Sequence, residues 1–280
     1  MKGLNREQKK AAGFTNGIAA VIAVPGSGKT LVMMERIGNL VKQYNVQPET
    51  IIGLTFNRNA AEQMRQRLIP VLGELAQRVT LSTIHSWCHY LLRTEGRVFE
   101  IISGKEQINM IRNLMKRKRL DLSVGTILSE ISLAKNNLIG VEEFRALYES
   151  DKTMIKVANI YESYEKEKAK KYLLDFDDLL LETYFLLNNN NAVREKYAGR
   201  YHHILIDEFQ DTNPVQLEII KLIVDHGPDI LVRELLDLHD FMRGPEPVEE
   251  VHEWDAGLER RSLGDQGHVH HFLHRARGQH

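Results

Sequence analysis

Short apolar runs alternate with helical patterns along most of the chain. Five runs have the length and composition of buried strands: 18–22, 51–55, 79–83, 203–207 and 229–232. Amphipathic segments at helical spacing follow the first four of them, for example at 59–68 and 214–224. Strands that alternate with helices predict an α/β fold with a parallel sheet.

The pattern changes between about residues 105 and 200. Ile108, Ile111 and Leu114 recur at helical spacing, and no convincing strand pattern interrupts this stretch. We therefore expect a mostly helical insertion at 96–185, which divides the core into residues 1–95 and 186–232.

A glycine-rich turn joins the first strand to its helix, and it reads Ala23-Val24-Pro25-Gly26-Ser27-Gly28-Lys29-Thr30. Glycines allow backbone N–H groups to surround an anion, and the helix start adds the positive end of its dipole. A phosphate-binding loop needs this strand–loop–helix context. The alternative is a glycine turn that happens to precede a lysine, and such a turn would not need the flanking strand and helix. Lys29 is placed to reach the β- and γ-phosphates of ATP, and the Thr30 hydroxyl to ligate Mg²⁺. Ala23 stands where the usual motif has its first glycine.

Two carboxylates follow the strand at 203–207, in the string Asp207-Glu208-Phe209-Gln210-Asp211-Thr212. The carboxyl end of a parallel strand is where ligands bind, so this string should lie beside the phosphate loop. Asp207 would then hold Mg²⁺, and Glu208 would polarise the water that attacks the γ-phosphate. The alternative is an acidic turn in which Asp211 or Thr212 caps the next helix.

These strings resemble the N-terminal part of UvrD/Rep/PcrA-type superfamily 1 DNA helicases, over about residues 3 to 232. The resemblance implies a RecA-like P-loop fold with a helical 1B insertion. It also implies ATP and Mg²⁺ as cofactors, with single-stranded DNA and a duplex junction as partners. Gln8, in the string Leu4-Asn5-x-x-Gln8, would read the adenine edge, and Gln210 would also contact the nucleotide.

Two further strings resemble the family's DNA motifs. Thr55-Phe56, followed by Ala60-Ala61, is similar to motif Ia, and Thr83-Ile84-His85-Ser86 is similar to motif Ib. The resemblance implies DNA contacts by Thr55, Phe56, Arg58, Thr83 and His85, with Arg58 in place of the lysine usual in the family. From the residues alone, Phe56 could equally pack beneath the sheet edge, and His85 could be a helix cap or a core histidine.

The resemblance stops after Val232. The family continues with Gly-Asp and Gln-Ser-Ile-Tyr, its motif III, whereas this chain reads Arg233-Glu234-Leu235. The family's later 2A and 2B domains have no counterpart, so we expect no duplex unwinding by this chain alone. In the full-length enzyme the activity would be ATP-driven movement on single strands in the 3′ to 5′ direction. One alternative is an inactive module that binds ATP and DNA; another, a P-loop kinase, is disfavoured by motifs Ia and Ib.

The composition changes at the same point. Residues 233–280 contain no Lys, Ile, Asn, Thr or Tyr, whereas the first 232 residues contain 17 Lys and 22 Ile. This tail holds six Arg against ten acidic residues and seven of the twelve His. We expect out-of-frame translation from about Arg233 and a poorly packed tail. The alternative is a divergent C-terminal cap that covers the sheet edge, and the coding DNA in the other two frames discriminates between them.

Three other clusters have simpler explanations. Asp175, Asp177 and Asp178 could bind a metal, but helix capping explains them as well and is preferred. The basic run at 116–119 could grip duplex phosphates, although most such runs are solvated helix ends. The histidines at 268–274 lack the acids or cysteines of a metal site.

Global composition favours a cytoplasmic, monomeric protein. The chain has 280 residues, a formal net charge of −1 and a single cysteine, Cys88, which excludes an internal disulfide and fits a reducing compartment. No segment has the length and hydrophobicity of a signal peptide or a membrane span, so no membrane partner is expected.

Overall fold

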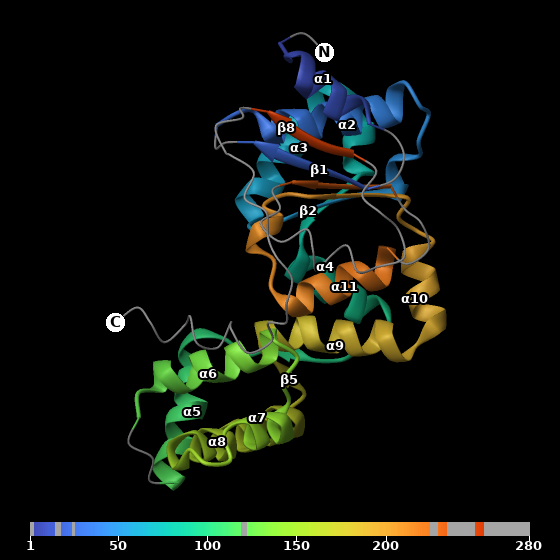
Figure 1. Ribbon diagram of the computed structural model, residues 1–280. Helices are drawn as coiled ribbons and strands as arrows, with labels where there is room; N and C mark the ends of the chain where they lie inside the picture. Colours follow the sequence, from blue (N-terminus) through green and yellow to red (C-terminus); the bar gives the residue numbers. More distant parts are fainter. Residues whose placement is uncertain are drawn as a thin grey trace.

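The computed structural model describes residues 3–14, 18–23, 26–118, 122–224, 229–233 and 250–254. These residues form a parallel sheet with helices on both faces, and a second group of helices lies at one end of this core (Figure 1). The arrangement is the RecA-like α/β fold with a helical insertion that the sequence predicts.

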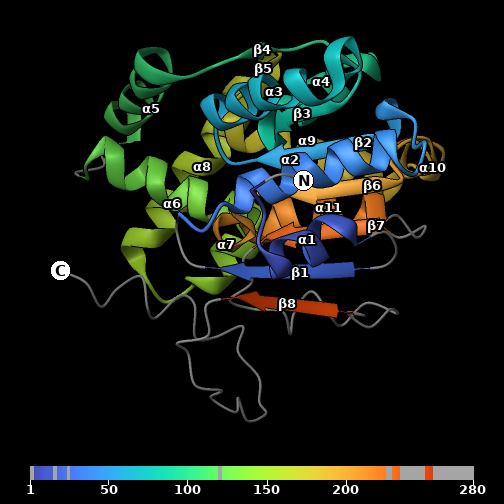
Figure 2. The same cartoon turned by 90° about the horizontal axis from the view of Figure 1, so that it is seen from above.

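The main sheet has six strands in the described part of the chain: β1 (Ile18–Ala23), β2 (Ile51–Thr55), β3 (Thr80–Thr83), β6 (His203–Ile206), β7 (Asp229–Arg233) and β8 (Glu250–Trp254). Their order is β3-β2-β6-β7-β1-β8, and every neighbouring pair is parallel. Figure 2 shows the sheet from above, with β1 and β8 at one side of the molecule. β7 therefore separates β6 from β1, the strand that precedes the phosphate loop.

Side chains of the central strands alternate between two hydrophobic clusters, as the period of two in a strand requires. Ile51 and Leu205 point to the cluster beneath one set of helices, whereas Ile52 and Ile204 belong to the cluster on the opposite face. The first face is covered by α1 (Arg6–Gly13), α2 (Lys29–Lys42) and α3 (Arg58–Leu72). The second is covered by α4 (Ile84–Thr94), α9 (Phe176–Asn189), α10 (Asn191–Ala198) and α11 (Pro214–Val224).

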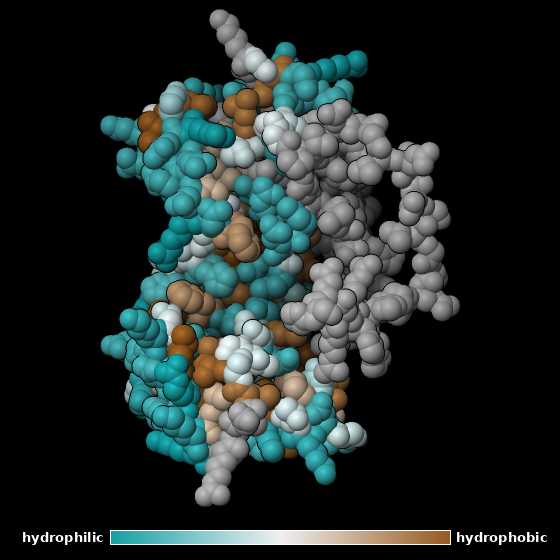
Figure 3. Space-filling view, turned by 90° about the vertical axis from the view of Figure 1, so that its left-hand side faces the viewer, coloured by the Kyte–Doolittle hydropathy of each residue, from teal (hydrophilic) through white to brown (hydrophobic). Residues whose placement is uncertain are grey.

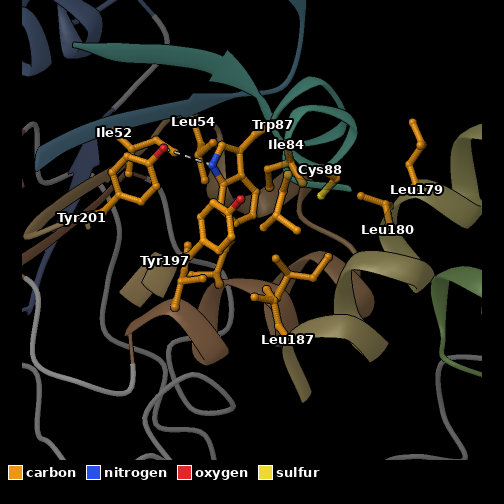
Figure 4. Packing of buried hydrophobic residues seen from close by; sticks show 14 of the residues in the cluster. Ile52, Leu54, Ile84, Trp87, Cys88, Leu179, Leu180, Leu187, Tyr197 and Tyr201 are labelled. Carbon is orange, nitrogen blue, oxygen red and sulfur yellow. Dashed lines mark hydrogen bonds between the residues drawn. The ribbon is translucent and has the colours of Figure 1, made fainter. Parts of the chain in front are cut away.

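Aromatic residues anchor the second cluster (Figure 4). The Trp87 indole meets the Tyr197 ring edge-on at 6.0 Å, and its Nε1–H donates to the Tyr201 hydroxyl at 3.4 Å. Cys88 is buried beside them, and burial raises the pKa of its thiol to about 12. Cys88 is therefore an unreactive packing residue, as expected from its surroundings in the sequence.

The insertion has a hydrophobic cluster of its own, which includes Ile111, Ile131 and Val157. Its helices are α5 (Gly104–Lys118), α6 (Val124–Asn136), α7 (Val141–Leu147) and α8 (Lys152–Lys170). Figure 3 shows one side of the molecule, on which hydrophobic surface gathers mainly in the lower half, where the insertion lies.

Two features at the base of the insertion differ from the sequence prediction. The short parallel strands β4 (Glu100–Ile101) and β5 (Leu173–Leu174) pair there, and β5 lies within the stretch from 105 to 200 in which no strand was expected. Two-residue strands carry too little alternation to be recognised in a sequence. In addition, α9 packs with α4 and α11 in the core cluster, so residues 176–185, which the predicted boundaries assign to the insertion, lie with the core.

The chain beyond Val232 is described only in part. Arg233 ends β7, and Glu250–Trp254 form β8, which pairs in parallel with β1 from Ala19↔Glu250 to Ala23↔Trp254. A strand on the β1 edge is the arrangement expected of a C-terminal cap, rather than of a tail without packing. The other tail residues, including the histidines at 268–274, lie outside the described residues, and the reading frame stays a prediction. No helix in the described ranges is long and apolar enough to span a membrane.

Candidate functional site

The phosphate loop adopts a backbone that glycine permits. Gly26 and Gly28 have φ angles of +80° and +87°, values that side chains disfavour, and Gly28 caps α2. Lys29 and Thr30 are the first two residues of that helix, so their backbone N–H groups stand at its positive end. Val24 and Pro25 lie outside the described residues, as does the side chain of Ala23, so these predicted contacts are not tested.

The loop has the donors that a phosphate chain needs. The Ser27 hydroxyl is buried, and no hydrogen-bond partner for it occurs among the described residues. Lys29 is only 5% exposed, so its side chain is largely shielded from bulk water. A buried hydroxyl in a glycine loop at a helix start fits the oxygen atoms of a nucleotide phosphate.

Asp207 and Glu208 follow β6 at the same edge of the sheet. The buried Asp207 is fixed by its backbone N–H, which donates to the Leu54 carbonyl at 2.8 Å. Glu208 lies in the left-handed region with φ of 54°, a conformation that costs a non-glycine residue about 1–3 kcal/mol. Because β7 separates β6 from β1, the strands that precede the acids and the phosphate loop lie roughly 10 Å apart.

Two predicted nucleotide contacts have additional roles. The Gln210 amide donates to the Glu208 carboxylate at 2.7 Å and thereby orients it. The Gln8 side chain accepts from the Asn5 backbone N–H at 2.9 Å and donates to the Ser27 carbonyl at 2.7 Å. Gln8 therefore belongs to the capping box of α1 and also contacts the phosphate loop.

Three of the five predicted DNA contacts, Thr55, Phe56 and His85, share one cavity with the two acids, whereas Arg58 and Thr83 do not line it. This cavity has a volume of about 90 Å³ and is lined by Leu54, Thr55, Phe56, Ile84, His85, Ile206, Asp207, Glu208, Thr212 and Gln216. Phe56 is 63% exposed, which excludes packing beneath the sheet edge. The Thr55 hydroxyl is buried and has no hydrogen-bond partner among the described residues. Arg58, at the start of α3, is exposed.

The residues of motif Ib divide their roles between helix capping and the cavity. Thr83 caps α4, because its hydroxyl accepts from the Ser86 N–H at 3.1 Å. His85 is half-buried, and its ring meets the Phe176 ring edge-on at 6.4 Å. Burial lowers the pKa of His85 against the opposing charge of Asp177, so the imidazole is neutral at neutral pH.

The acidic cluster at the start of α9 is a charged junction rather than a metal site. Asp175 and Asp178 form the capping box of α9, as preferred from the sequence. The Lys135 ammonium lies 2.8 Å from Asp175 and 2.6 Å from Asp178, and Lys168 contacts both carboxylates as well. Glu165 offers a third carboxylate, but the two ammonium groups occupy the place a cation would take.

Two further sequence predictions concern the cap of α11 and the basic run of the insertion. The cap of α11 is Asn213, not Asp211 or Thr212, since its side chain accepts from the Gln216 N–H at 2.9 Å. Lys116, Arg117 and Lys118 are exposed at the end of α5, and Arg119 lies outside the described residues.

A glycine loop at a helix start, paired with two acids after a neighbouring strand, defines a P-loop nucleotide-binding protein. The profile of the UvrD/REP helicase N-terminal domain matches residues 4–232, and the chain belongs to this family. The match ends where the composition changes.

Curated relatives agree with this assignment. The chain is 34% identical over 241 residues to the ATP-dependent DNA helicase PcrA of Bacillus subtilis (strain 168), covering 83% of this chain and 32% of the relative. It is 33% identical over 234 residues to the probable DNA helicase II homolog of Mycoplasma capricolum, covering 79% of this chain and 32% of the relative. The chain thus spans about a third of the length of these relatives.

Proposed function

We propose that this chain binds Mg-ATP at the phosphate loop and single-stranded DNA across the adjoining cavity. In the full-length enzyme it would be the ATP-binding N-terminal portion of a 3′ to 5′ DNA helicase. The observation that carries the proposal is the cavity itself, because Phe56 and His85 line it together with Asp207 and Glu208. A DNA base held by Phe56 and His85 would therefore lie beside Asp207 and Glu208, the residues that we propose act on ATP.

The nucleotide half of the proposal assigns a role to each charged residue. Lys29 would neutralise the β- and γ-phosphates, and Thr30 and Asp207 would hold Mg²⁺. The cation would supply compensation for the negative charge of the phosphate oxygens. Glu208, oriented by Gln210 and held in its left-handed conformation, would accept a proton from the attacking water.

The DNA half rests on exposure and on neutral polar groups. Phe56 presents its ring to solvent at the carboxyl end of β2, where a base could stack on it. His85 and the Thr55 hydroxyl would add uncharged contacts beside it. Arg58 would supply a phosphate contact, because it is exposed at the start of the following helix. We further propose a monomeric, cytoplasmic protein, in accord with its buried single cysteine.

Phe56→Ala tests the DNA half directly. Titration of a fluorescent oligothymidine by anisotropy should show a loss of about 5- to 150-fold in affinity, because base stacking contributes ~1–3 kcal/mol. The matched control is Tyr44→Ala, which removes another aromatic ring, 49% exposed, just beyond the end of α2. Equal affinities of wild type and Phe56→Ala would contradict the proposed DNA site.

A further inference from the structure

A series of side-chain hydrogen bonds leads from the segment after Glu208 into the helical insertion. Asn213 begins this series, five residues after Glu208. Asn213 and Gln216 exchange hydrogen bonds at the start of α11, with the Asn213 N–H donating at 3.3 Å and the Gln216 N–H at 2.9 Å. The capping geometry fixes the Asn213 side chain and directs its amide nitrogen away from the helix.

That amide nitrogen donates to Asn136 on α6. The Asn213 Nδ2 lies 2.8 Å from the Asn136 Oδ1, across 77 positions of sequence. Asn136 in turn donates through its own Nδ2 to Asp177 on α9, at 3.2 Å, and to Ser132, at 3.2 Å. One half-buried amide therefore joins three elements: the segment at 207–213, which we call motif II, the insertion, and the start of α9.

The neighbours of this bridge are held firmly. Lys135 precedes Asn136 on α6, and its buried ammonium is paired with Asp175 and Asp178, which flank Asp177 on α9. Such a buried pair resists separation, because parting the groups leaves an uncompensated charge. We therefore treat the end of α6 and the start of α9 as one rigid body.

The same body contacts the DNA side of the cavity. Phe176, the first residue of α9, packs edge-on against His85, and the Asp177 charge acts on the His85 imidazole. A displacement of α9 at its first turn therefore reaches His85, and through Asn136 it also reaches Asn213.

We propose that the Asn136–Asn213 hydrogen bond couples nucleotide binding to DNA binding, with Asn136 as a positioning residue between the insertion and motif II. This inference rests on the proposed function, since it presumes that both ligands bind. A nucleotide that draws in Glu208 shifts Asn213, and Asn136 transmits the shift to the body that contacts His85. By linkage, DNA changes the affinity for nucleotide by the same factor.

The test measures that factor. The dissociation constant of a fluorescent oligothymidine is determined with and without a saturating, non-hydrolysable Mg-ATP analogue, for wild type and for Asn136→Ala. Wild type should show a ratio within the range of about 5- to 150-fold that is typical of coupled sites. In Asn136→Ala the ratio should fall to about one, while the affinity for the analogue alone changes little.

Two variants separate coupling from general damage to α6. Asn137→Ala alters the next residue, whose exposed amide bonds only locally to the Leu133 carbonyl at 2.8 Å, and it should keep the wild-type ratio. The second is the double variant Asn136→Asp with Asp177→Asn. The carboxylate at position 136 would still accept from Asn213, and the new amide at position 177 would donate to it across the contact with α9. This exchange should restore a ratio above that of Asn136→Ala.

The outcomes distinguish the inference from the proposed function. If wild type and Asn136→Ala bind both ligands and show the same ratio, the inference is overturned and the proposed function stands. If wild type binds both ligands with no dependence of one on the other, the inference is likewise overturned. If wild type binds neither ligand, the proposed function fails and the inference fails with it.

Discussion

The nucleotide edge of the core and the junction with the insertion both place charged groups together, but by different means. At the nucleotide edge, Lys29 and Asp207 each follow a parallel strand, so the sheet itself aligns them. At the junction, Lys135 and Lys168 come from two helices of the insertion and meet the carboxylates of a third helix. The first arrangement places each group at the end of a strand, whereas the second depends on the packing of helix against helix.

The two regions also differ in how their charged and polar groups are compensated. The junction neutralises its acids internally: burial alone would raise the pKa of Asp175, but Lys135 and Lys168 outweigh it and hold that pKa well below its usual range. Burial likewise opposes the charge of Lys135, yet Asp178 and Asp175 raise the pKa of its ammonium. The nucleotide edge instead collects donors that suit a ligand, including the Ser27 hydroxyl, for which the described part of the chain offers no hydrogen-bond partner. The charges at the junction are therefore compensated within the protein, whereas those at the edge are the groups that we propose bind a ligand.

The largest effect expected on stability follows from breaking the junction. Lys135→Met removes one ammonium and leaves buried carboxylates undercompensated, which should lower the free energy of unfolding by about 3–5 kcal/mol. Urea denaturation measures it. The control is Lys166→Met on the same helix as Lys168. Lys166 pairs with Glu162 at the exposed surface, so its loss should change the free energy of unfolding far less. Similar losses in the two variants would show that the junction does not stabilise the fold.

As the pH falls, the core should lose stability at a higher pH than the charged junction does. Burial, with help from the Arg36 charge, lowers the pKa of His203 on β6 to about 4. Between pH 6.5, the pKa of an unperturbed histidine, and pH 4, the unfolded chain binds a proton that the folded chain does not. The free energy of unfolding should therefore fall as the pH drops through this window. Asp175, whose pKa is lowered, loses its contribution only below about pH 4.

Urea denaturation at a series of pH values checks this order. His203→Gln should flatten the dependence between pH 6.5 and 4, whereas substitution of the exposed neighbour His202 by Gln should preserve it. An unchanged slope in His203→Gln would contradict the assignment of this window to the buried imidazole.

Sequence patterns predicted the core well, because its elements are local. A helix follows the phosphate loop as expected, Asp175 is a helix cap, and α11 runs from Pro214 to Val224 as predicted. Each of these features depends on neighbours a few residues away in sequence.

Features that depend on distant contacts were not predictable. Nothing near Asn136 indicates that it meets Asn213 across 77 positions, and a lysine such as Lys135 is normally expected on the surface. The exposure of Phe56 and the left-handed backbone of Glu208 also depend on how strands end against one another. The strand at Glu250–Trp254 has no periodicity that distinguishes it from the rest of the tail.

If the phosphate loop binds ATP through Lys29, a titration of a fluorescent Mg-ATP analogue should depend on that side chain. Lys29→Ala should weaken binding by about 10- to 150-fold, because a hydrogen bond to a charged group contributes ~1.5–3 kcal/mol. Lys42→Ala, at the exposed far end of the same helix, and Glu208→Gln, which keeps the shape of the carboxylate, should both bind as wild type does. Equal affinities of wild type and Lys29→Ala would contradict the account.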